Sequence, residues 1–122
     1  MKNLTTGVLV AAMLLLSGAA LAQPPSTAGL WSRADGLAET SRRSEESART
    51  DIRRGLVDAA LMRYRNVVQT IGDEIAVLET LCGHERDLDR QQVARMRLAE
   101  SRDRLERAED IMHLLRVNSN RR

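Results

Sequence analysis

The sequence predicts an all-α fold in which two long helices form an antiparallel, coiled-coil-like hairpin and a shorter helix precedes them. Apolar side chains recur every three or four residues through two long stretches, which is the spacing of one helix face. No proline follows Pro25, so none is present beyond it to break a helix. The 122 residues include no Phe, one Trp and one Tyr, a composition that suits helices packed through Leu, Ile, Val and Ala.

The first 22 residues have the features of a signal peptide. Lys2 gives a positive start, residues 8–16 are apolar and uncharged, and residues 20–22 (A-L-A) form the small-x-small pattern of a cleavage site. We expect cleavage after Ala22 and a mature protein in the periplasm or outside the cell. The alternative is a retained membrane anchor, because residues 4–22 approach the length that spans a bilayer.

A short flexible lead-in is predicted for residues 23–27, whose sequence is Q-P-P-S-T. The first helix is predicted to begin near Ala28, because Leu30, Trp31 and Leu37 recur at helical spacing. The helical domain as a whole is expected to span residues 28–117.

The end of this first helix is less clearly marked. Residues 40–49 are mostly Ser, Arg and Glu and offer little to bury. We expect a break near Gly55, with Thr50 as the N-cap of the next helix. The sequence leaves open whether residues 28–50 form a separate helix or extend that next helix.

The second helix organises the rest of the chain. Its apolar residues alternate at spacings of four and three without interruption, the pattern of a narrow seam that faces a partner helix. These residues are Val57, Leu61, Tyr64, Val68, Ile71, Ile75, Leu78 and Cys82. Gly83 follows at once, and we expect the helix to end there because glycine commonly ends helices in the left-handed conformation.

The third helix carries the same pattern. It is predicted to begin with Asp89 as N-cap and Gln92 completing a capping box, or with Asp87 as the alternative cap, and to end near Val117. Residues 118–122 are expected to fray. Its seam consists of Ala94, Leu98, Ser101, Leu105, Ala108, Met112 and Leu115.

The two seams match when the helices are laid antiparallel. The predicted register places Ile71 opposite Leu98 and Val68 opposite Ser101, so that large residues often face small ones. We therefore assign an interaction seam to Val57, Leu61, Tyr64, Val68, Ile71, Ile75, Leu78, Leu98, Leu105 and Met112.

Apolar side chains remain outside this seam. Val67, Val77 and Leu81 widen the apolar face of the second helix beyond what one partner covers, and Ile111, Leu114 and Val117 do the same at the end of the third. Either the first helix covers them, which gives a three-helix bundle, or a second copy of the chain does, which gives a dimeric four-helix bundle.

Cys82 is the only cysteine, and in an oxidising compartment it is a candidate for an intermolecular disulfide. The favoured interpretation is a small apolar residue in the last layer of the seam. Together with His84, Glu85 and Asp87 it could supply metal ligands, but the spacing matches no metal motif. We predict no metal site, no cofactor and no catalytic residue.

The arginines do not indicate nucleic-acid binding. After signal cleavage the chain has 18 arginines and 17 acidic residues, and on the third helix the two signs interleave at spacings of four. A phosphate-binding surface would show an uncompensated basic stripe. No catalytic motif is present either, so neither nucleic acid nor a small-molecule substrate is expected.

These observations predict a non-catalytic, exported helical protein-interaction module of the bacterial envelope. It would be a component or adaptor of a secretion or surface assembly, and would bind a protein partner or a second copy of itself. The alternative is a periplasmic stress chaperone or metal sensor of helical-hairpin type.

Overall fold

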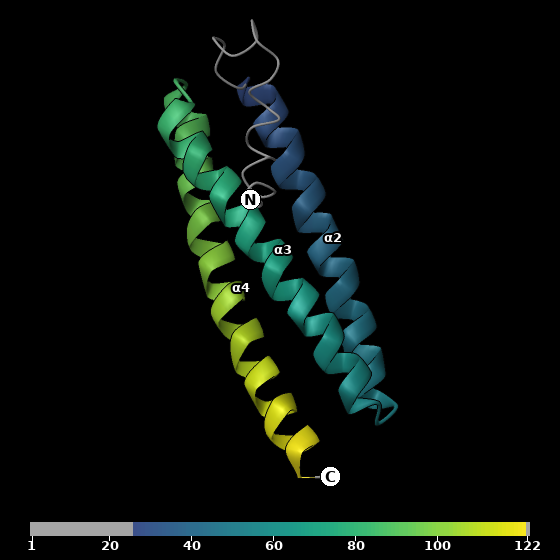
Figure 1. Ribbon diagram of the computed structural model, residues 1–122. Helices are drawn as coiled ribbons and strands as arrows, with labels where there is room; N and C mark the ends of the chain where they lie inside the picture. The colour runs from purple at the N-terminus through teal and green to yellow at the C-terminus, as the bar shows by residue number, and fades with distance from the viewer. Residues whose placement is uncertain (1–25, 122) are drawn as a thin grey trace, which may run out of the picture.

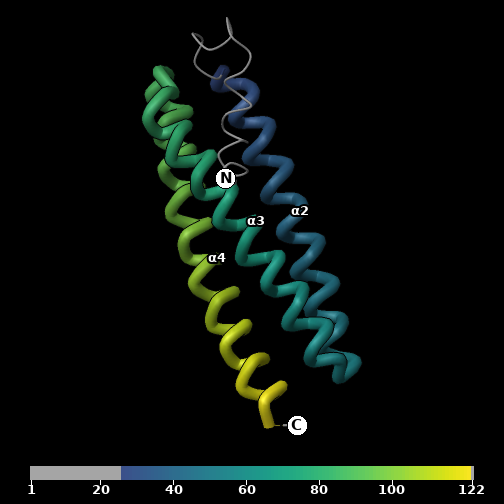
Figure 2. Tube along the Cα trace, in the orientation of Figure 1, coloured from purple at the N-terminus to yellow at the C-terminus, as the bar shows by residue number. Residues whose placement is uncertain are grey.

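Three helices make up the fold, and each runs antiparallel to the next (Figure 1). The computed structural model describes residues 26–121, which form α2 (Thr27–Arg53), α3 (Val57–His84) and α4 (Leu88–Asn120) and contain no strand. α3 packs against both neighbours, whereas α2 and α4 run in the same direction on either side of it (Figure 2). The predicted all-α class is confirmed, and the first helix covers the apolar face that the hairpin leaves open.

α2 begins one residue before the predicted start and ends at Arg53, beside the break predicted near Gly55, but the predicted cap at Thr50 is wrong. The Ser26 hydroxyl accepts a hydrogen bond from the Gly29 N–H at 3.0 Å, so the helix starts at Thr27, inside the predicted lead-in. It also continues through Thr50, whose hydroxyl donates to a carbonyl of its own helix, so Thr50 does not cap the next helix. The chain reverses at Gly55, whose φ of 76° costs glycine little. α2 is thus a separate helix, only one residue shorter than α3.

Small side chains let α2 lie close to α3. Its buried residues are Ala34, Ala38, Ser41, Ala48 and Asp51. The polar C-terminal half of α2 therefore also packs against the bundle, because it buries a residue every one or two turns. The Asp51 carboxylate accepts a hydrogen bond from Arg63 Nε at 2.7 Å, which joins the last turn of α2 to α3 and explains why the helix runs past Thr50.

The connection between α3 and α4 is shorter than predicted. Gly83 is helical and not left-handed, and the Glu85 N–H donates to the Leu81 carbonyl at 2.8 Å, so α3 continues to His84. Of the two predicted caps for α4, Asp87 is the one used. Its carboxylate accepts hydrogen bonds from two N–H groups of the first turn, at 2.9 and 3.4 Å.

The hairpin of α3 and α4 has the predicted orientation, but its register differs by about one heptad. The Ser101 hydroxyl donates to Glu74 at 3.0 Å, and the Ser119 hydroxyl donates to Asp58 at 2.6 Å. Val68, the predicted partner of Ser101, lies six residues before Glu74, which is about 9 Å along a helix. The predicted pairing is therefore wrong by roughly two turns.

The core clusters show the same displacement. Ile71 and Leu98, a predicted pair, belong to different clusters. A slide of seven residues brings the same seam positions into contact, because the apolar pattern repeats every seven residues. The pattern fixes which faces meet, and the short connection decides the register.

α4 is longer at its C-terminal end than predicted. α4 continues to Asn120, three residues beyond the predicted end at Val117. The hydrogen bond from Ser119 to Asp58 holds this last turn against the start of α3. The predicted end of the helix at Val117 is therefore three residues too early, and the fraying of the last residues stays a prediction.

The core is divided into two apolar clusters. The one nearer the α2–α3 turn contains Ala48, Ala60, Leu61, Tyr64, Val67, Ile71, Ala108 and Leu115. The one nearer the α3–α4 connection contains Ala34, Val77, Leu78, Leu81, Ala94 and Leu98. Between them on α3 lies Glu74, a buried carboxylate.

Candidate interaction surface

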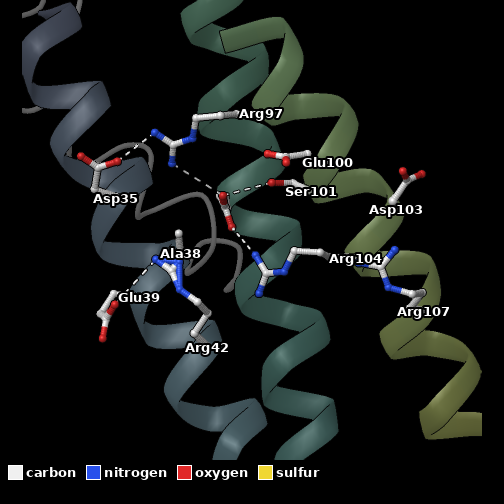
Figure 3. A pocket seen from close by; sticks show the side chains of 11 residues that line it. Asp35, Ala38, Glu39, Arg42, Arg97, Glu100, Ser101, Asp103, Arg104 and Arg107 are labelled. Carbon is white, nitrogen blue, oxygen red and sulfur yellow. Dashed lines mark hydrogen bonds and ion pairs between the residues drawn. The ribbon is translucent and has the colours of Figure 1, made fainter. Parts of the chain in front are cut away.

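An open groove runs between α2 and α4, with α3 as its floor (Figure 3). Its larger hollow has a volume of about 780 Å³, and a smaller hollow of about 320 Å³ continues towards the α2–α3 turn. Four arginines and five carboxylates line the larger hollow. The groove is therefore a charged surface and not an apolar one.

A polar network on the groove floor joins all three helices. The Glu74 side chain is 3% exposed and accepts a hydrogen bond from Ser101 at 3.0 Å. Arg104 and Arg97 extend from α4 towards it, with nitrogen–oxygen distances of 3.5 and 3.8 Å (Figure 3). Arg104 also donates to the Ser41 hydroxyl of α2 at 2.7 Å. The network compensates a carboxylate that would otherwise be unpaired inside the bundle.

A second set of contacts extends the network to the α3–α4 connection. Arg97 forms an ion pair with Asp35 at 2.8 Å, and its guanidinium lies 5.6 Å from the ring centre of Trp31. The Trp31 indole N–H donates to the Glu85 carboxylate at 2.9 Å. The N-terminal half of α2 is thus bound both to α4 and to the residue that follows α3.

We expect Trp31 fluorescence to report the titration of Glu85. The hydrogen bond from Trp31 is the main cause that lowers the pKa of this carboxyl below its ordinary 4.5. Because the folded-state pKa is the lower one, the bond stabilises the fold above pH 4.5, and this contribution is lost as pH falls through the folded pKa. The fluorescence of the single tryptophan should therefore change with pH with a midpoint below pH 4.5. In the variant Glu85→Gln this transition should be absent. A midpoint at or above 4.5 would contradict the bond.

The smaller hollow is lined by four arginines and two glutamates: Arg42, Arg49, Arg104, Arg107, Glu45 and Glu46. Glu45 accepts hydrogen bonds from Arg49 and from the Tyr64 hydroxyl, both at 3.3 Å. Burial, followed by the charge of Glu45, raises the pKa of Tyr64 above 10.0. The hydroxyl of Ser101, which lines the larger hollow, and that of Ser41, which is buried beneath it, are both engaged in the Glu74 network. This arrangement offers charge and hydrogen bonds but no activated nucleophile.

The side of α4 that points away from α3 forms a second continuous stripe, which we call the outer face. Its residues are spaced by three and four without interruption and are all exposed: Val93, Met96, Glu100, Asp103, Arg107, Asp110, Leu114 and Val117. The four apolar side chains lie at the two ends and are 36% to 62% exposed. Charged residues occupy the middle.

The residues of the predicted interaction seam lie between the helices of the bundle. Five of its ten residues are buried: Leu61, Tyr64, Ile71, Leu78 and Leu98. The other five are half-buried beside the clusters: Val57, Val68, Ile75, Leu105 and Met112. Contacts between α3 and its neighbours therefore occupy most of this seam, and a surface for an external partner must be sought elsewhere on the bundle.

The residues near the α3–α4 connection have separate local roles. Cys82 is half-buried against the second cluster, and its intermolecular disulfide stays a prediction. His84 Nδ1 lies 3.0 Å from a carbonyl of α3, Glu85 bonds Trp31, and Asp87 caps α4. Within residues 26–121 no three His, Cys, Asp or Glu side chains gather in a way that could hold a metal ion.

Glu74 is the residue of the groove that sequence reasoning missed. It belongs to a row of α3 residues spaced by seven, Ala60, Val67, Glu74 and Leu81, all of which are buried. The sequence places Val67 and Leu81 on the widened apolar face. Glu74 lies seven residues from each of them, and this spacing indicates that its carboxylate is buried on the same face.

No protein-family model, curated protein or solved structure matches the chain. Over the part that the structure describes, none of the helices is apolar enough over sufficient length to cross a membrane. Function must therefore be inferred from the groove and the outer face of α4.

Proposed function

We propose that this chain is an exported, non-catalytic module of the bacterial envelope that binds another protein through the outer face of α4, as a component or adaptor of a secretion or surface assembly. The carrying observation is the set of four exposed apolar residues on that face, Val93, Met96, Leu114 and Val117. α4 already buries its seam against α3, and these side chains stay 36% to 62% exposed on the opposite side of the helix. Apolar residues at helical spacing on an exposed face are typical of helices that bind a partner.

The groove supports the proposal, and the expected export gives it a compartment. The outer face borders the groove, whose lining combines ion pairs such as Asp35–Arg97 and Glu74–Arg104 with the outer-face residues Glu100, Asp103 and Arg107. A charged border of this kind suits the polar rim of a protein interface. The expectation of export depends on residues 1–22, which lie outside the described residues, and it sets the compartment in which a partner would be found.

Site-specific photocrosslinking tests the proposal in cells that produce the full chain. A photoreactive amino acid placed in turn at Val93, Met96, Leu114 and Val117 should trap the same protein species at all four positions. Placement at Met62 or Arg95, exposed positions on α3 and on another side of α4, provides the matched control. An absence of any species specific to the four outer-face positions would contradict the proposal.

A further inference from the structure

The outer face of α4 is self-complementary about the level of Leu105. Val93 and Val117 each lie twelve residues from Leu105, and Met96 and Leu114 each lie nine residues from it. When two copies of a helix pair antiparallel about a two-fold axis, a residue n positions before the centre meets the residue n positions after it on the other copy. Val93 then meets Val117 of the second copy, and Met96 meets Leu114, at both ends of the contact.

The charges in the middle of the face show the same symmetry. Asp103 and Arg107 each lie two residues from Leu105, so the two-fold pairing places Asp103 against Arg107 of the second copy, twice. Within the described chain neither side chain has an ion-pair or hydrogen-bond partner of its own. Glu100 meets Asp110 in the same arrangement, also twice. These two like-charged pairs weaken the contact without preventing it, because exposed charges are screened.

We propose that the partner bound by the outer face is a second copy of this chain, with the two α4 helices antiparallel about an axis at the level of Leu105. The inference rests on the proposed function, whose surface it uses. Residues 93–117 span about 36 Å of helix, and a strip of one helix's width over that length buries on the order of 500 Å² per copy. That total lies at the low end of specific interfaces, so the dimer is reversible and not obligate.

Sedimentation equilibrium of the mature chain, with reductant present to exclude a disulfide through Cys82, tests the pairing. Asp103→Arg and Arg107→Asp each place two like-charged pairs across the axis and should weaken self-association by roughly tenfold. Mixing the two variants should restore it, because both central pairs of the mixed dimer are then opposite in sign. Arg95→Asp and Asp73→Arg, exposed charges elsewhere, provide the matched controls.

A gain of affinity complements these losses. Asp110→Arg converts the Glu100–Asp110 contact into an attractive one and should strengthen the dimer by roughly tenfold. A variant that fails to fold would lose this contact, so misfolding cannot explain a stronger dimer. A chain that stays monomeric at all concentrations, or a dimer indifferent to these charge changes, would overturn the inference. If the chain is monomeric while the four outer-face positions still crosslink to a different protein, the proposed function stands and only the identity of the partner is wrong.

Discussion

Replacing Leu78 by alanine is expected to lower the free energy of unfolding by about 3 kcal/mol. Leu78 is fully buried on the middle helix, in the cluster that Ala34 of α2 and Leu98 of α4 also form. Both flanking helices are already in contact with α3, so neither can move in to fill the space without losing other contacts. The variant therefore combines a lost apolar side chain with a residual cavity.

Met62→Ala is the matched control for this prediction. Met62 lies on the same helix, has an apolar side chain of similar size and is 65% exposed, so its truncation should change stability by less than about 0.5 kcal/mol. Denaturant unfolding of the two variants measures the difference directly, and the melting temperature of Leu78→Ala should fall by roughly 10 °C or more. Equal stabilities for the two variants would show that the inner side of α3 is not enclosed.

Removing Arg104 is expected to destabilise the protein by about 2–3 kcal/mol, whereas replacing its partner Glu74 by leucine is expected to be neutral or stabilising. Arg104→Met leaves the Glu74 carboxylate buried with Ser101 and a more distant Arg97. Burial of a charge whose partner has been removed is costly. Glu74→Leu removes the charge itself and joins the two apolar clusters, while Arg97 and Arg104 can turn to water from their partly exposed positions.

The double variant Glu74→Leu, Arg104→Met shows whether Arg104 stabilises the fold through Glu74 or through its other contacts. If Arg104 stabilises the fold mainly by compensating Glu74, then Arg104→Met should cost much less when Glu74 is already leucine. The three variants and the parent protein, compared by denaturant unfolding, give the coupling energy. Equal costs of Arg104→Met in both backgrounds would mean that Arg104 acts through Ser41 or through packing and not through Glu74.

Periodicity alone predicts most of this fold. The seams from Val57 to Cys82 and from Ala94 to Leu115 give two helices and their antiparallel orientation. Val67, Val77 and Leu81 indicate that a further helix, from the same chain or from a second copy, covers α3, and the structure shows that α2 does so. The register could not be predicted in the same way, because a seven-residue repeat is unchanged by a slide of one heptad. It depends on the length of the connection, which Gly83 obscured by suggesting an early helix end.

The groove was less predictable for a different reason. Its network depends on Arg97, Ser101 and Arg104 of α4 reaching one carboxylate of α3, and on Arg104 also bonding Ser41 of α2. The spacing within any one helix contains no sign of that meeting. The same limit applies to Thr50, a good capping residue that lies inside α2 because Asp51 finds Arg63 on α3. The outer face of α4, in contrast, is visible in the sequence once the seam against α3 is known.

The most direct test of the fold is whether α2 and α4 lie on either side of α3 with Asp35 beside Arg97. In a Cys82→Ser background, cysteines at these two positions should be joined within one chain by a short bismaleimide, giving a cross-linked product of monomer mass. Cysteines at positions 35 and 116 should not be joined, because position 116 lies about 28 Å farther along α4. Failure of the 35–97 pair to react, or equal reaction of both pairs, would contradict the three-helix arrangement.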